Sequence, residues 1–219
     1  METDVHVTAD GVLIAFHDDR LERVTDRSGV VAGTSWSVLK EARVGGTEPI
    51  LRFEELLEAL PEMRINVEPK HDAAVGPLIS AIRRSNSIER LCVGSFSDRR
   101  LAMLRSALGS ALCTSLGTRE VAVLRVAAWG LPAFGGLLAR RPGRCVQIPT
   151  DAYGVSLVTP RLVRVAHELG LPVHVWTVND EPEMNRLLDL GVDGLMSDRP
   201  HLLREVLVAR GAWPGTTAG

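Results

Sequence analysis

The first nineteen residues, Met1–Asp19, read METDVHVTADGVLIAFHDD and place acidic and histidine side chains close together in the chain. The pattern of residues 2–7 predicts a strand, and Glu2, Asp4 and His6 then share one face of it because strand side chains alternate between two faces. The two carboxylates would lie roughly 7 Å apart at their Cα atoms. This stretch therefore predicts a strand that presents a pair of acids on one side.

A hairpin is expected to follow this strand directly. Asp10 and Gly11 form a turn dipeptide, and the apolar run VLIAFH after them predicts a second strand that brings His17 back to the same region. The histidine follows an apolar strand and precedes Asp18, so we expect it to be exposed, with a pKa near neutrality that suits proton transfer. An acidic pair with a returning histidine is a pattern suited to a metal ion and to acid–base chemistry.

The composition indicates one globular domain. The chain has 219 residues, 45% of them hydrophobic, and a formal charge of -2, which gives no electrostatic basis for binding nucleic acid. No apolar run approaches the ~20 residues of a membrane helix. Three widely spaced cysteines lie in or beside apolar runs and are interpreted as buried thiols. We expect a cytoplasmic protein, with a signal peptide upstream of Met1 as the alternative.

Short strands alternate with helices along most of the chain, which is typical of βα units around a parallel sheet. Strands are predicted to begin at Glu2, Ile65, Leu91, Ala111, Cys145, Val173 and Gly194, with helices over 51–60, 73–84, 97–108, 119–129, 137–141, 159–170, 180–190 and 200–209. Seven such strands in 219 residues predict a (β/α)8 barrel without its first βα unit, because a complete barrel has ~250 residues. Residues 1–210 would form this single domain, with a hairpin and long loop inserted over 8–50 and a tail over 211–219. The alternative is an open doubly wound sheet, but no predicted strand of this sequence is followed by the glycine-rich phosphate loop that nucleotide binders of that fold require.

The run INVEPK supplies a second set of charged residues at the end of a predicted strand. Glu68 and Lys70 alternate onto one face there, and active groups of parallel βα folds lie at the carboxyl ends of strands. Together with Glu2 and Asp4, Glu68 would supply three oxygen ligands, which suit Mg²⁺ or Ca²⁺ better than zinc. Each of these charges alone would be read as a solvated residue at a strand end.

The remaining aromatic and histidine candidates are weaker. Trp176 lies within VHVWTVND and is interpreted as an apolar wall of a substrate pocket or as an ordinary core residue. The other histidines have no such context and are interpreted as structural or surface residues: His6, His71, His167, His174 and His201.

Three separated segments resemble the glycerophosphodiester phosphodiesterase family: ETDVHVTADGVLIAFHDDRLERVT, INVEPK and VHVWTVNDEPEMNRLLDLGVDGLMSDRP. The resemblance implies a βα barrel of the PLC-like phosphodiesterase type with a small insertion after the second strand. It also implies hydrolysis of glycerophosphodiesters to sn-glycerol 3-phosphate and an alcohol, as part of lipid metabolism, with a divalent cation, Mg²⁺ or Ca²⁺. The partner would be this small substrate, with no nucleic acid and no stable membrane insertion. Carried over by motif, the metal ligands are Glu2, Asp4 and Glu68, the proton donor is His17, the phosphate contact is Lys70, and the seventh-strand tryptophan is Trp176.

One family feature is absent from these 219 residues, namely a strand ending in His-Arg-Gly followed by a Pro-Glu-Asn-Thr segment. The resemblance assigns a second acid–base histidine and a phosphate-binding arginine to that strand. We therefore expect an internal start site, a shortened chain or a degenerate homologue, and an activity lower by on the order of 10². The alternatives are a protein that binds metal and phosphate without turnover, and a phospholipase with GLPAFGGLL, residues 130–138, as an apolar lip.

Overall fold

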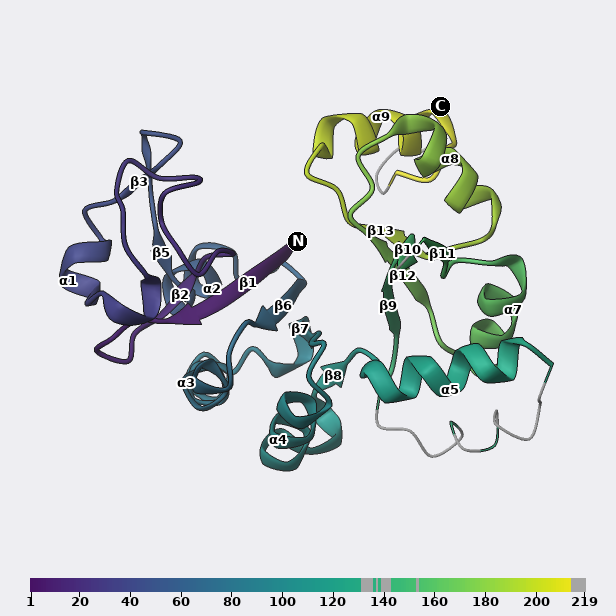
Figure 1. Cartoon of the computed structure of the whole chain (residues 1–219), viewed down its shortest axis with the longest axis horizontal. Helices are drawn as coiled ribbons and strands as arrows, with labels where there is room; N and C mark the ends of the chain where they lie inside the picture. The colour runs from purple at the N-terminus through teal and green to yellow at the C-terminus, as the bar shows by residue number, and fades with distance from the viewer. Residues whose placement is uncertain (131–135, 137, 139–142, 153, 214–219) are drawn as a thin grey trace. The chain divides into compact units, whose positions relative to one another are not determined.

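The structure is a computed structural model that describes residues 1–130, 136, 138, 143–152 and 154–213. The chain divides into two compact units, Met1–Gly117 and Thr118–Gly219. Each unit contains its own sheet and helices, so the two are described one after the other (Figure 1).

The first unit is built on a six-stranded sheet with the order β5-β2-β1-β6-β7-β8. Its strands are β1 (Glu2–Val7), β2 (Leu13–Ala15), β5 (Leu51–Arg52), β6 (Ile65–Pro69), β7 (Leu91–Val93) and β8 (Cys113–Thr114). The strands β1, β6, β7 and β8 are parallel, whereas β2 and β5 add to the β1 edge in antiparallel fashion. Four parallel strands with helical connections form the βα core expected from the sequence.

The predicted hairpin at the start of the chain is confirmed. The strands β1 and β2 pair antiparallel, with Val5 opposite Ala15 and Val7 opposite Leu13. Gly11 in the turn has a φ of 83°. This left-handed conformation favours glycine, and the turn reverses the chain so that β2 runs back along β1 toward its start.

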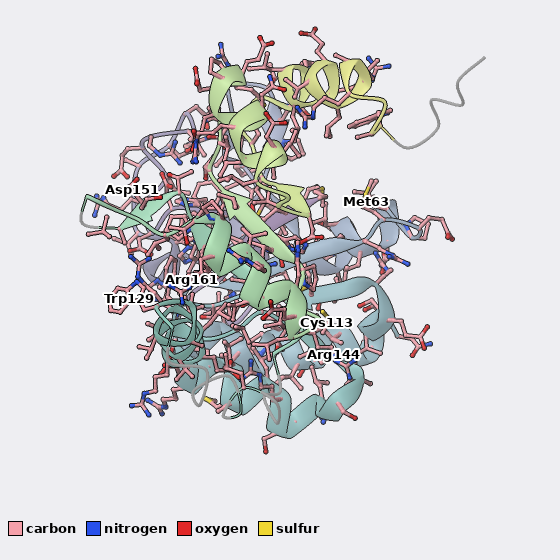
Figure 2. All side chains as sticks on the ribbon, turned by 90° about the vertical axis from the view of Figure 1, so that its right-hand side faces the viewer. Met63, Cys113, Trp129, Arg144, Asp151 and Arg161 are labelled. Carbon is pink, nitrogen blue, oxygen red and sulfur yellow. The ribbon has the colours of Figure 1, made fainter. Side chains whose placement is uncertain are left out.

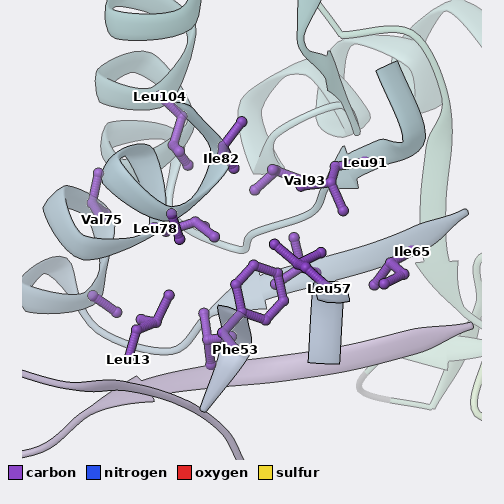
Figure 3. Close-up of a cluster of buried hydrophobic side chains, with 14 of the residues drawn as sticks. Leu13, Phe53, Leu57, Ile65, Val75, Leu78, Ile82, Leu91, Val93 and Leu104 are labelled. Atoms are coloured by element: carbon purple, nitrogen blue, oxygen red, sulfur yellow. The ribbon is translucent and has the colours of Figure 1, made fainter. Parts of the chain in front are cut away.

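Three helices cover one face of this sheet: α2 (Phe53–Ala59), α3 (Asp72–Arg84) and α4 (Asp98–Leu108). Leucine, isoleucine and valine side chains from these helices pack against apolar residues of β1, β6 and β7, and Phe53 lies fully buried among them (Figure 3). Burial of each large apolar side chain contributes about 1.5–3 kcal/mol. Because Val5 and Val67 point into this core, their neighbours in each strand point to the other face.

The insertion after β1 has a hydrophobic cluster of its own. It contains the 3-10 helix η1 (Val31–Gly33), the short helix α1 (Trp36–Leu39) and the hairpin of β3 (Arg43–Val44) with β4 (Glu48–Pro49). Its buried side chains are Ile14, Phe16, Leu21, Val31, Leu39, Ala42 and Ile50. The predicted loop over 8–50 is therefore a packed structure, and it shares Ile14 and Phe16 with the segment that leads to His17.

The second unit contains a three-stranded parallel sheet with the order β13-β12-β9. Its elements are α5 (Thr118–Ala128), β9 (Val146–Pro149), the hairpin of β10 (Asp151–Ala152) with β11 (Val155–Ser156), α7 (Pro160–Glu168), β12 (Val173–Trp176), α8 (Glu181–Asp189), β13 (Gly194–Leu195) and α9 (Pro200–Ala209). Thr159 and Asp180 cap α7 and α8 by accepting hydrogen bonds from backbone N–H groups of the first turn.

The helices α5 and α7 of this unit lie side by side (Figures 1 and 2). Trp129 follows α5 and Arg161 lies in the first turn of α7, close to each other in Figure 2. The Arg161 side chain lies over Gly130, so that a Cβ atom at position 130 would be only 2.7 Å from Nη2 of Arg161. Glycine at position 130 therefore permits this close approach.

All seven predicted strands are present, and two of them begin later than predicted, one of these being β9, which begins at Val146 and not at Cys145. The strand expected from Ala111 begins at Cys113, because the 3-10 helix η3 (Gly109–Ala111) follows α4, and a further 3-10 helix, η2 (Ile88–Arg90), precedes β7. The helix predicted over 137–141 and the apolar segment 130–138 lie almost entirely outside the described residues. Within the part of the chain that the structure describes, no helix is both long and apolar enough to cross a membrane.

Candidate active site

The acidic residues predicted from β1 and β6 lie side by side in the structure. The parallel register places Asp4 opposite Glu68 and Glu2 opposite Asn66. Val5 and Val67, which adjoin Asp4 and Glu68 in the two strands, are buried in the core on the other face, so the three carboxylates occupy the face that points away from α2 and α3. Two short strands thus bring together acids that are more than sixty residues apart in sequence.

Lys70 lies among these carboxylates. Its backbone N–H donates to the carbonyl oxygen of Val5 at 3.1 Å, which extends the β1–β6 pairing by one residue. Its Nζ atom lies 2.8 Å from Oδ1 of Asp4 and 3.3 Å from Oε2 of Glu68. Asp4 is only 8% exposed, so the ammonium group neutralises a carboxylate that water hardly reaches.

Glu2 shows the effect of burying several acids together. Its pKa is raised to about 7, first by partial desolvation of the carboxyl group and then by the negative charge of Asp4, while Lys70 opposes the shift. Glu68 adds to the increase, and His17 opposes it. A divalent cation beside these carboxylates would relieve their mutual repulsion.

His17 is presented by the end of the hairpin. The backbone N–H of Phe16 donates to the carbonyl oxygen of Asp4 at 3.0 Å, which ties the residue before His17 to β1. The His17 side chain is 65% exposed, and its Nδ1 atom lies 2.6 Å from Oδ1 of Asp18. Arg23 donates to the same carboxylate. This hydrogen bond is the largest cause that holds the pKa of Asp18 well below its usual range, and the hydrogen bond with His17 is the second. The exposure expected for His17 is confirmed, and an ion-paired carboxylate orients its ring.

A second group of residues near His17 was not predicted as a site. His6 is buried on β1, and its Nε2 atom lies 2.9 Å from the carbonyl oxygen of His17. Nε2 of His71, directly after Lys70, lies 2.8 Å from Oδ1 of Asp19. The sequence signal for His6 was its position two residues after Asp4 on the same strand face. The proximity of Asp19 to His71, which lies 52 residues further along the chain, had no such signal.

Trp176 lies in the other unit. It is the last residue of β12, opposite Pro149 of β9, and is half-buried. The structure therefore brings five of the six predicted site residues into the first unit and places the sixth at a strand end of the second unit.

The chemistry of the donor set in the first unit fits a hard divalent cation. Three carboxylates on adjacent strands supply oxygen ligands, as Mg²⁺ and Ca²⁺ require. In the structure the positive charge beside Asp4 and Glu68 is the ammonium of Lys70. A positively charged group next to acids that bind a cation is also suited to the phosphate of an anionic substrate.

Solved structures share the fold of the chain over most of its length. A glycerophosphodiester phosphodiesterase from Agrobacterium tumefaciens aligns with a TM-score of 0.72 at 20% sequence identity, covering 92% of this chain and 85% of that one. A phosphodiesterase from Oleispira antarctica, solved in complex with the product sn-glycerol-3-phosphate, aligns with a TM-score of 0.74 at 22% identity, covering 94% of this chain and 84% of that one. The fold is the (β/α)8 barrel type predicted from the strand pattern.

Sequence relatives identify the class. A protein of Mycobacterium tuberculosis named "Probable glycerophosphodiester phosphodiesterase 2" is 40% identical over 216 residues, which are 98% of this chain and 81% of that protein. The chain is a phosphoric diester hydrolase of the barrel type. The model of the glycerophosphoryl diester phosphodiesterase family matches residues 1–202, and the chain belongs to that family.

Proposed function

We propose that the chain hydrolyses glycerophosphodiesters to sn-glycerol 3-phosphate and an alcohol with the help of a divalent cation. The observation that carries this proposal is the in-register pairing of Asp4 with Glu68, with the ammonium of Lys70 between them. Family membership supports the reaction class. The product bound to the Oleispira phosphodiesterase supports glycerol 3-phosphate as the product.

In this proposal, Glu2, Asp4 and Glu68 hold the cation, as either Mg²⁺ or Ca²⁺. When bound, the cation stabilises the negative charge that develops on the phosphate oxygens. Lys70 binds a phosphate oxygen beside the same carboxylates. Its position explains how a strongly acidic pocket accepts an anionic substrate.

His17 is the proposed proton donor to the leaving alkoxide. Because Nδ1 of its ring lies 2.6 Å from Oδ1 of Asp18, the ring is held in one orientation, as a general acid requires. Arg23 in turn fixes Asp18.

A second candidate function is binding of a cation and a phosphate ester without turnover. It rests on the carboxylates of the adjacent strands and the ammonium of Lys70, which are suited to a cation and a phosphate whether or not a diester is cleaved. Both functions use the same carboxylates and Lys70, so they differ in turnover and not in binding.

Turnover of glycerophosphocholine by residues 1–219 separates the two functions. We expect release of glycerol 3-phosphate with Mg²⁺ or Ca²⁺ and none after chelation. His17→Asn should lower kcat by about 10²–10⁴, the usual effect of losing a general acid. Calorimetric binding of glycerol 3-phosphate with cation, with no release of product, would instead support the second function.

Two matched controls show that any loss is specific to the site. His167→Asn removes another exposed histidine that is paired with an aspartate, Asp193, at 2.8 Å. Glu68→Gln removes one of the proposed cation ligands. Its control is Glu183→Gln, which removes a glutamate that is ion-paired with Arg186. We expect full activity in both controls. Equal losses in the site variants and the controls would contradict the proposed roles.

A further inference from the structure

A cluster of two imidazoles and one carboxylate lies next to the proposed active site. His6 is 1% exposed on β1, Asp19 follows the His17-Asp18 pair, and His71 is the N-cap residue of α3. The Nε2 atom of His71 lies 2.8 Å from Oδ1 of Asp19, and Nε2 of His6 lies 3.9 Å from the same oxygen. The three ligand atoms lie within 4.8 Å of one another.

These separations match the dimensions of a tetrahedral metal site. Zinc binds histidine nitrogen and carboxylate oxygen at about 2.0–2.2 Å, so two ligand atoms of a tetrahedral site lie roughly 3.3 Å apart. The observed distances of 2.8 and 3.9 Å lie on either side of that value. The third separation, between the two imidazole nitrogens, is at most 4.8 Å, so side-chain movements of about 1.5 Å or less would place the three atoms around one ion.

We propose that His6, Asp19 and His71 form a second metal site, which binds a borderline transition-metal ion such as Zn²⁺. Two imidazoles favour Zn²⁺ and its neighbours in the first transition row, whereas the three-carboxylate cluster favours Mg²⁺ or Ca²⁺. The two sites thus select different classes of cation. The proposal concerns binding at a separate set of residues and does not require that the chain hydrolyse a diester.

The buried histidine is prepared for this role. His6 is 1% exposed, so its ring is held in place by the residues packed around it, and a metal ligand of this type binds as the neutral imidazole. Its Nε2 atom also lies 2.9 Å from the carbonyl oxygen of His17, so that the neutral ring can donate a proton there. For Nε2 to bind a metal ion, the ring proton moves to Nδ1 and the imidazole stays neutral, and the carbonyl oxygen then lies close to the same ion as an additional oxygen donor.

The charge near the cluster does not prevent cation binding. Two positive residues directly adjoin the cluster in the chain, but the ammonium of Lys70 contacts Asp4 and Glu68, and the guanidinium of Arg20 contacts Glu22. Asp19 is 67% exposed at its side chain, which leaves the cluster accessible from solvent. An ion at this site would hold Asp19 and the backbone of His17 together and would fix the segment that carries the proposed proton donor.

Calorimetric titration with Zn²⁺ tests the proposal on the full chain. We expect the parent chain to bind one zinc ion. His71→Asn and Asp19→Asn should bind zinc with an affinity at least about 100-fold lower, because loss of a ligand costs at least as much as loss of its supporting contacts. Both substituted side chains are exposed, so folding should be retained. His167→Asn is the matched control, because His167 also pairs with an aspartate at 2.8 Å, and it should bind zinc as the parent chain does.

Two further measurements make the result decisive. Glu68→Gln should keep the zinc affinity while losing affinity for Mg²⁺, which separates the two sites. Co²⁺ in place of zinc should give the visible absorption of a tetrahedral nitrogen–oxygen site, and this absorption should be lost in His71→Asn. The proposal is overturned if the parent chain binds no zinc, if His71→Asn and Asp19→Asn bind it unchanged, or if Glu68→Gln abolishes the binding.

Discussion

The Nζ atom of Lys70 lies 2.8 Å from Oδ1 of Asp4, so a carboxylate that is almost fully buried is neutralised by the residue that directly follows the neighbouring parallel strand. The two residues are brought together by the β1–β6 pairing, which continues through the hydrogen bond from the Lys70 N–H to the carbonyl oxygen of Val5. Charge balance and strand pairing at this point of the fold therefore depend on each other.

Lys70→Met should destabilise the chain in the absence of a divalent cation. The variant leaves Asp4 and Glu68 without their positive partner, and we expect a loss of about 1–3 kcal/mol, below the range for fully buried pairs because the Lys70 side chain is 23% exposed. Mg²⁺ or Ca²⁺ should raise the Tm of the variant more than that of the parent chain. Thermal unfolding with and without cation measures both effects.

The chain provides a matched control for this substitution, since Lys40 is its other lysine. Lys40 is exposed at the end of α1, so Lys40→Met should change the Tm little. Equal cation-dependent recovery in both lysine variants would argue against the role of Lys70 as the counter-charge of the carboxylates.

Asp10→Asn should reveal a pH-dependent contribution of the hairpin turn to stability. Two hydrogen bonds lower the pKa of Asp10. The larger effect comes from the Thr8 hydroxyl and the smaller from the Trp36 N–H. A carboxyl group whose pKa is lower in the folded state stabilises it above the unfolded pKa of about 3.9, and this contribution is lost as the pH falls through the folded value. Asparagine keeps the acceptor oxygen but does not titrate.

The Tm of the parent chain should therefore exceed that of Asp10→Asn by a small margin at neutral pH, and the margin should vanish in acid. Thermal unfolding of both proteins from neutral pH to below the ordinary aspartate pKa gives the comparison. A margin that is the same at every pH would show that the ionised form of Asp10 contributes nothing.

Phe53→Ala should be among the most damaging substitutions in the first unit. Phe53 is fully buried between α2 and the sheet, and removing a buried phenylalanine side chain costs about 3–5 kcal/mol. Phe96→Ala is the control, because that side chain is 64% exposed and should change the free energy of unfolding by less than about 0.5 kcal/mol. Denaturant unfolding of the two variants measures the difference, and similar values would contradict the assigned core.

Gly130→Ala should destabilise the second unit for two reasons. Gly130 has a φ of +102°, and its new Cβ atom would lie 2.7 Å from Nη2 of Arg161. Gly170 also has a positive φ, +68°, but a Cβ atom added at position 170 would meet no heavy atom within 4 Å. Gly170→Ala should therefore cost about 1–2 kcal/mol from the backbone alone, and Gly130→Ala should cost more.

Adding Arg161→Ala to Gly130→Ala should recover the part of the loss that comes from the close approach. The loss that remains should match that of Gly170→Ala, because in both variants it then comes only from holding alanine at a positive φ. No recovery in the double variant, measured by thermal unfolding, would mean that Arg161 moves away at no cost.

The acidic part of the site could be predicted because it depends on strand periodicity. Glu2 and Asp4 alternate along one strand, Glu68 lies near the end of another, and parallel strands bring their carboxyl ends to one edge of a sheet. The hairpin was equally predictable from Asp10-Gly11 between apolar runs. These features are local or follow from a general rule of βα folds.

The cluster of His6, Asp19 and His71 could not be predicted in the same way. His71 meets Asp19 only because the loop after β6 and the loop after β2 take particular courses, and no periodic pattern specifies a loop. The packed structure of the insertion was missed for a similar reason. Its buried residues are spread over irregular segments, so their spacing matches neither a helix nor a strand.

The cluster of buried side chains in the insertion gives the two halves of the active site separate hydrophobic supports. Ile14 and Phe16 belong to this cluster and lie just before His17, whereas Val5 and Val67, beside the acidic ligands, belong to the core under α2 and α3. A local opening of the insertion would withdraw His17, the proposed proton donor, while the β1–β6 pairing remains intact. A substitution such as Val31→Ala, distant from the site in sequence, would then lower the turnover rate while the affinity for the cation is retained.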